Sequence, residues 1–161
     1  VGSEMCIRDR WNKVPFQMLI MPPINLSYFE QEETVSMMKD WEFLNDRQVF
    51  WALSWDMNGK LLNRIPLIKK LKWREWFAIK GVYGHLTDKN NPFLEKNEND
   101  DTIFLFPKGS DIMGNTPYWE CVVGVHNIFK FFAVEYVRRL TYINRPGIHK
   151  GGVRFNFMMS F

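Results

Sequence analysis

Few residues in this chain have the types and spacing that catalysis or metal binding requires. The histidines His85, His126 and His149 lie far apart and show no metal-ligand spacing, whereas a zinc site needs convergent nitrogen or sulfur ligands. Cys121 falls on the apolar face of an alternating segment. We expect it to be a small buried hydrophobic residue, because no histidine–acid pair accompanies it to activate a nucleophile. The sequence therefore predicts no enzyme activity, no cofactor and no metal, with His126 as a polar residue on an inner face.

The sequence contains one acidic and one basic group of residues, and both are expected to be solvent-exposed loops or turns. Acidic residues gather in a long polar stretch, residues 88–115, where a solvated loop is expected; they are Glu95, Glu98, Asp100 and Asp101. Oxygen-rich loops can bind calcium, but no EF-hand spacing occurs here. Basic residues gather beside Leu71 and Trp73 and fit a solvated turn; they are Lys69, Lys70 and Lys72. Contact of these lysines with lipid head groups is the alternative.

A set of four charged residues lies on three neighbouring segments that alternate like strands. It comprises Glu120, Glu135, Arg139 and Arg154. Opposite charges on adjacent strands stabilise a sheet by about 0.2–1 kcal/mol for each pair. If the apolar faces of these strands point to lipid, the four charges point into a barrel lumen. We expect them to form a charge ladder that fixes strand register.

Arg138 interrupts this pattern because it shares a face with Tyr136 and Leu140. An Arg facing lipid at the bilayer midplane costs about 2–4 kcal/mol, and about 0–1 kcal/mol near the interface. Arg138 therefore lies near the interface, or a β-bulge shifts the alternation there, or the sheet belongs to a soluble β-sandwich.

The elements that carry these residues alternate with a period of two, which is the period of β-strands. Six strands are expected, at residues 35–43, 48–57, 73–85, 118–127, 132–142 and 153–161. Residues 61–71 fit a short amphipathic helical turn in a connection. The sequence thus predicts an all-β fold, an antiparallel meander of about six strands. No stretch of 18 apolar residues is present, so no transmembrane helix is expected.

The last segment, residues 153–161, separates its side chains into two faces. Odd positions are Val153, Phe155, Phe157, Met159 and Phe161, and even positions are Arg154, Asn156, Met158 and Ser160. This pattern resembles the closing strand of a Gram-negative outer-membrane β-barrel. The resemblance implies that Phe155, Phe157, Met159 and Phe161 form the C-terminal signal that the barrel-insertion machinery reads.

The start of the chain is expected to be foreign to the protein. Residues 1–10, VGSEMCIRDR, resemble the translation of a sequencing adapter, and such segments are set aside before fold reasoning. Residues 11–161 are then expected to be the C-terminal portion of a barrel domain, because about six strands cannot close a membrane barrel, which begins at about eight. The strands would pair with a missing N-terminal part of the same barrel.

The net charge of the chain is +3. The adapter holds two basic and two acidic residues, so removing it leaves this charge unchanged. A net charge of +3 is too small to indicate nucleic-acid binding.

Several stretches resemble one family of Bacteroidetes outer-membrane proteins, in which a β-barrel of unknown function follows a carboxypeptidase-regulatory-like domain. The matching stretches are WEFLNDR at 41–47, LNRIPLIKKLKWRE at 62–75, YGHLTDKN at 83–90, GVHNIFKFF at 124–132 and YVRRLTY at 136–142. The resemblance covers nearly all of the chain after residue 10. It implies the C-terminal region of an outer-membrane barrel and does not imply peptidase activity, because the domain that gives the family its name is an accessory β-sandwich. The adapter-like start adds the expectation of a fragment from metagenomic sequencing.

Two function classes remain open from the sequence. The first is a non-enzymatic outer-membrane barrel that transports or assembles material at the envelope, with lipid and the insertion machinery as partners. The second is a soluble or secreted β-sandwich that binds carbohydrate or protein. A sandwich would bury Trp51, Trp55, Phe155 and Phe157 against a second sheet, whereas a barrel would expose apolar side chains in this way to lipid.

Overall fold

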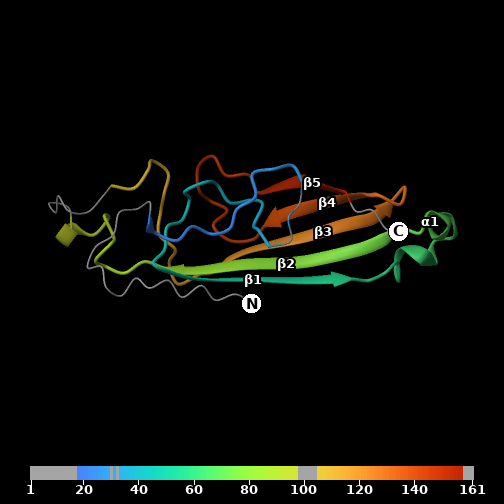
Figure 1. Ribbon diagram of the computed structural model, residues 1–161, viewed down its shortest axis with the longest axis horizontal. Helices are drawn as coiled ribbons and strands as arrows, with labels where there is room; N and C mark the ends of the chain where they lie inside the picture. Colours follow the sequence, from blue (N-terminus) through green and yellow to red (C-terminus); the bar gives the residue numbers. More distant parts are fainter. Residues whose placement is uncertain (1–17, 30, 32, 98–104, 158–161) are drawn as a thin grey trace. The chain divides into compact units, whose positions relative to one another are not determined.

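A single antiparallel sheet organises the chain. The computed structural model describes all residues except 1–17, 30, 32, 98–104 and 158–161. Five strands pair in chain order, β1-β2-β3-β4-β5 (Figure 1). They are β1 (Arg47–Asp56), β2 (Arg74–His85), β3 (Tyr118–Ile128), β4 (Phe132–Arg139) and β5 (Gly151–Phe157). The predicted all-β antiparallel meander is confirmed as an open sheet, with five strands in the described part of the chain where about six were expected.

The chain divides into two compact units. Unit 1 contains Val1–Pro22, Asp40–Trp51 and Val82–Pro117, and unit 2 contains Pro23–Lys39, Ala52–Gly81 and Tyr118–Phe161. The adapter-like residues 1–10 and the last residues, 158–161, lie outside the described part.

The prediction of a strand at residues 35–43 is wrong. This segment forms only isolated bridges, from Val35 to Ile24 and from Phe43 to Asp111. Trp41 adopts a left-handed backbone conformation with φ of 59°, which interrupts an extended chain. Successive residues Met37 and Met38 are both buried, so the side chains do not alternate between two faces as they would in a strand.

The connection between β1 and β2 is helical, as the sequence predicts. It contains a 3-10 turn, η2 (Leu62–Arg64), and a short helix, α1 (Pro66–Leu71). Pro66 begins α1 at a position where its missing N–H is not needed, and Lys72, with φ of 53°, ends the helix in a left-handed cap. None of the described helices is long and apolar enough to cross a membrane.

Strand pairing in β3, β4 and β5 gives the sheet two different faces. On the buried face Glu120 lies opposite Arg139, Val122 opposite Val137, and Glu135 opposite Arg154. The rows between them form the other face: Cys121–Arg138–Gly151, Val123–Tyr136–Val153 and Val125–Val134–Phe155. The register shifts only after Val125, near the β3–β4 turn. The face on which each side chain lies is therefore fixed along the rest of β3.

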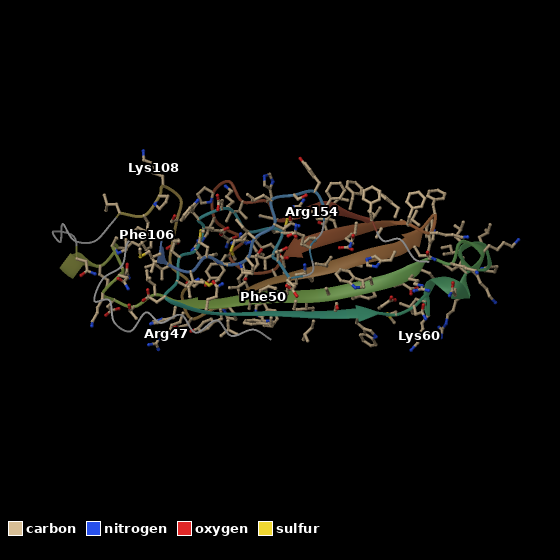
Figure 2. All side chains as sticks on the ribbon, viewed as in Figure 1. Arg47, Phe50, Lys60, Phe106, Lys108 and Arg154 are labelled. Carbon is tan, nitrogen blue, oxygen red and sulfur yellow. The ribbon has the colours of Figure 1, made fainter. Side chains whose placement is uncertain are left out.

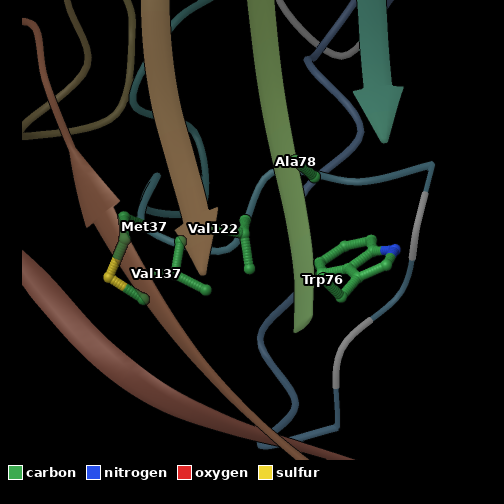
Figure 3. Packing of buried hydrophobic residues seen from close by; sticks show 5 residues of the cluster. All are labelled: Met37, Trp76, Ala78, Val122 and Val137. Atoms are coloured by element: carbon green, nitrogen blue, oxygen red, sulfur yellow. The ribbon is translucent and has the colours of Figure 1, made fainter. Parts of the chain in front are cut away.

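Each unit has its own apolar core. In unit 2, Met37 packs with Trp76, Ala78, Val122 and Val137 (Figure 3). In unit 1 the buried core is Leu19, Leu44 and Leu86, with Trp41, Phe106 and Ile112 packed against it. Residue 37 lies outside the strands, so the unit 2 core forms only when residues 23–39 cover the sheet.

Gly84 on β2 gives a test of packing in unit 1. A Cβ atom there would lie 2.2 Å from Cγ of Asn45, and Asn45 is fully buried. We expect Gly84→Ala to lower the free energy of unfolding by about 1–3 kcal/mol, the usual cost of overpacking. The matched control is Gly114→Ala, because nothing lies within 4 Å of that added Cβ. Equal urea midpoints for the two variants would contradict this prediction.

Candidate functional site: a charged cluster beneath residues 23–39

Glu120 on β3 lies at the centre of a buried polar cluster in unit 2. Its side chain is fully buried, and its carboxylate accepts hydrogen bonds from the backbone N–H of Ser36 at 2.9 Å and of Met37 at 3.2 Å. The hydroxyl of Tyr118 donates a third bond, at 3.0 Å. Hydrogen bonds to a charged group are about twice as strong as neutral ones, so this carboxylate ties residues 36 and 37 firmly to the sheet.

Two arginines complete the bonding of the same two residues. Arg139 on β4 donates from Nη1 to the carbonyl of Met37 at 3.3 Å, and Arg154 on β5 donates from Nη2 to the carbonyl of Ser36 at 2.9 Å. The Arg139 guanidinium also lies over the Tyr118 ring, 4.9 Å from its centroid. Both the N–H and the C=O groups of Ser36 and Met37 are therefore bonded by charged side chains from three strands.

Lys80 on β2 holds the preceding turn. Its ammonium group donates to the carbonyls of Gln31 at 2.8 Å and Thr34 at 2.9 Å, and only 1% of the residue is exposed. Four strands thus each contribute one charged side chain that bonds the backbone of a single segment. We call residues 23–39 the covering segment; in Figure 1 it is the blue part of the ribbon beside β4 and β5.

The covering segment is also folded upon itself. Val35 donates its N–H to Pro23 O at 2.9 Å, and its carbonyl accepts from the N–H of Asn25 at 2.8 Å. The Asn25 side chain accepts from Ser27 N–H and donates to Phe29 O, which shapes the loop between them. The segment therefore presents a preformed turn to the four charged residues.

His126 and Glu135 form a second polar contact on the same face. His126 Nε2 lies 2.8 Å from Glu135 Oε1, and both side chains are buried. The Trp76 ring stacks on the imidazole, with centroids 5.1 Å apart. Glu135 Oε2 is buried and makes no hydrogen bond to any described residue. Gly124 leaves room for this pair, because a Cβ there would lie 2.6 Å from Glu135 Cγ.

The structure brings the four residues of the predicted ladder to one face. Cα atoms of Glu120 and Arg139 are paired across β3 and β4, and those of Glu135 and Arg154 across β4 and β5. The carboxylate of Glu135 nevertheless contacts His126, and Arg154 contacts Ser36. Coupling within the ladder stays a prediction, and the sequence pattern missed Lys80 entirely.

The other singled-out residues take no part in this cluster. Cys121, expected to be buried, is instead half-buried with a free thiol, because it lies on the exposed face of β3; Arg138, exposed near the end of strand β4, lies opposite it. The bulge considered for Arg138 is absent, since the register shift lies beyond Val125. His85 and His149 are exposed, as is Glu95; residues Glu98, Asp100 and Asp101 lie outside the described part. No group of three or more metal-ligating side chains occurs among the described residues.

The face opposite the charged cluster is apolar and exposed. Along β3, β4 and β5 it carries the exposed residues Val123, Tyr136, Val153, Phe155 and Phe157. Phe132 contacts both phenylalanines of β5, with ring centroids 5.6 Å from Phe155 and 5.2 Å from Phe157. Two members of the predicted insertion signal, Phe155 and Phe157, lie on this face, whereas Met159 and Phe161 lie outside the described residues.

The contacts of the charged cluster bind and position the backbone of the chain's own covering segment. The charged groups of the cluster are occupied by backbone atoms of the covering segment. Figure 2 shows Arg154 on β5 beside this segment. No protein-family model, curated protein sequence or solved structure matches this chain.

The Glu120 contacts predict how the covering segment is held. We expect Glu120→Gln to weaken the bonds to Ser36 and Met37 by about 1–1.5 kcal/mol, the difference between hydrogen bonds to charged and to neutral groups. Amide hydrogen exchange at these two residues should accelerate by up to about tenfold. Glu95→Gln, an exposed position in unit 1, is the control and should leave both amides unchanged. Unaltered exchange in Glu120→Gln would refute the role of this carboxylate.

The His126–Glu135 contact predicts a measurable coupling energy. A double-mutant cycle with His126→Gln and Glu135→Gln should give about 0.5–3 kcal/mol, the range for residues in contact. The parallel cycle of Glu135 with Arg154 tests the ladder, for which about 0.2–1 kcal/mol is expected. Both coupling energies are measured by urea unfolding. A coupling energy of zero between Glu135 and Arg154 would refute the predicted charge ladder and leave His126 as the partner of Glu135.

Proposed function

We propose that this chain is part of a non-enzymatic outer-membrane β-barrel protein that acts in transport or assembly at the cell envelope. One observation carries the proposal: β3 and β4 bury all of their charged side chains except Arg138, whereas the opposite face of β3–β5 exposes large apolar side chains. Glu120, Glu135 and Arg139 are at most 1% exposed, whereas Tyr136 is 49% and Phe157 is 58% exposed.

The apolar half of this distribution is unfavourable in water, because exposed contiguous apolar patches mark contact surfaces in water-soluble proteins. The buried charges are paired with the covering segment or with His126, as fully buried charges usually are. In a transmembrane barrel the same distribution is favourable, because an apolar band faces lipid and the interior is polar. The exposed face of β3–β5 would then contact lipid, and the charged cluster would lie in the lumen.

Aromatic residues at one end of the sheet support the same assignment. Phe129 and Phe131 in the β3–β4 turn are exposed, and Phe132 and Phe157 are paired next to this turn. Membrane barrels carry aromatic girdles at their interfaces. The aromatic end would then lie at one of the two membrane interfaces.

A soluble β-sandwich is the second candidate. It is favoured by the difference between the two faces of β3–β5, one charged and covered, the other apolar and exposed. It would bury Trp55, Phe155 and Phe157 against a second sheet. Trp55 is 67% exposed and the described residues form one sheet, so this candidate requires a covering sheet contributed by residues outside the described part or by another polypeptide.

A charge placed on the apolar face tests the barrel against a sheet whose apolar face is open to water. In the barrel, Val123→Lys should lower the stability of the full-length protein in lipid vesicles by about 2–4 kcal/mol if the position lies near the midplane. At an exposed position in water, the change should remain within about 0.5 kcal/mol. Leu105→Lys, at a position that is 82% exposed in unit 1, is the control. A Val123→Lys protein that unfolds like the wild type would contradict the barrel.

A further inference from the structure

We propose that the α1 end of the sheet in unit 2 is a binding surface for anionic phospholipid. Two connections form this surface: residues 57–73 between β1 and β2, and residues 127–131 between β3 and β4. The side chain of Asn127 donates a hydrogen bond to the carbonyl of Lys72 at 2.7 Å, which joins the two connections directly. Figure 1 shows α1 and the β3–β4 turn at the same end of the strands.

The surface is basic throughout. Its charged side chains are Lys60, Arg64, Lys69, Lys70, Lys72 and Lys130, and all six are exposed. No acidic residue occurs in either connection. The acidic residues that flank the first connection in the sequence are Asp56, which accepts a bond from Asn58 N–H, and Glu75, which is buried and accepts one from Leu62 N–H. Lys60 is labelled at this end of the sheet in Figure 2.

Large apolar side chains are exposed among these charges. Leu67 is 81% exposed and Phe129 is 78% exposed, and Leu61, Ile65, Leu71 and Phe131 are each about half exposed. Leu67 and Leu71 are four residues apart and share one side of α1. Exposed leucine and phenylalanine beside lysine and arginine are the composition of segments that lie in a membrane interface.

Anionic phospholipid is the occupant that fits both features. The lysines match phosphate head groups, and the leucines and phenylalanines match the acyl boundary. An acidic protein would satisfy the charges, yet would leave the apolar side chains without an apolar partner. The inference uses only this end of unit 2 and does not depend on the barrel proposed above; in such a barrel this end would face the phospholipid leaflet.

Vesicle flotation of the whole chain, purified in uncharged detergent, tests the inference. The probes are vesicles of phosphatidylcholine alone and vesicles with about a third phosphatidylglycerol, each at low and high salt, because surface charge attraction is screened by salt. We expect binding at low salt to be at least about tenfold tighter with phosphatidylglycerol, since each basic residue near an anionic surface adds attraction. High salt should remove the difference.

Matched charge variants locate the effect. Lys69→Gln/Lys70→Gln/Lys72→Gln should lose the preference for phosphatidylglycerol. Lys89→Gln/Lys108→Gln/Lys150→Gln removes the same charge from exposed positions elsewhere and should keep it. Equal binding of the wild type to both vesicle types would overturn the inference. An equal loss of the preference for phosphatidylglycerol in the two variants would overturn it as well. Stable insertion into the vesicles, measured as resistance to urea extraction, tests the barrel separately. Lipid binding without insertion would therefore support this inference and contradict the barrel.

Discussion

The bonding of four charged side chains, three of them buried, to one covering segment is the interaction on which the rest of unit 2 depends. Lys80, Glu120, Arg139 and Arg154 come from four successive strands, and their hydrogen bonds converge on the backbone of residues 31–37. A buried charge without a partner costs several kcal/mol, so the sheet requires this segment in place. The segment in turn contributes Met37 to the apolar core. Polar and apolar contacts therefore stabilise the same arrangement.

The same bonding explains why residues 35–43 are not a strand. Backbone N–H and C=O groups that are buried must find partners, and a sheet neighbour is the usual source. Ser36 and Met37 have side-chain partners instead, from Glu120, Arg139 and Arg154. Their backbone has no need of a strand ladder, and the chain is able to turn at residues 40–41.

Alternation in the sequence predicted the strands well because the two faces of this sheet differ so strongly. Residues 48–57, 73–85 and 118–127 were expected as strands and lie within two residues of β1, β2 and β3 at either end. The alternation did not predict the side-chain contacts between residues far apart in the sequence. Lys80 stands among apolar neighbours with no local sign of its partners, 46 and 49 residues away. His126 meets Glu135 only because the register places Gly124 opposite that residue.

Buried charges also explain how this sheet could fix its register. Replacing buried ion pairs with apolar residues often leaves stability equal or higher, so stability alone is a weak reason for a cluster of this size. A slip of one residue in β4 would move Glu135 and Arg139 to the apolar face and bring Val134 and Tyr136 to the charged one, since side chains alternate strictly. With lipid on the apolar face, each charge moved there would carry a cost of kcal/mol size. With lipid there, the charged cluster would exclude the neighbouring registers of β4. Because the covering segment bonds Glu120, Arg139 and Arg154 at once, the registers of β3, β4 and β5 are selected together.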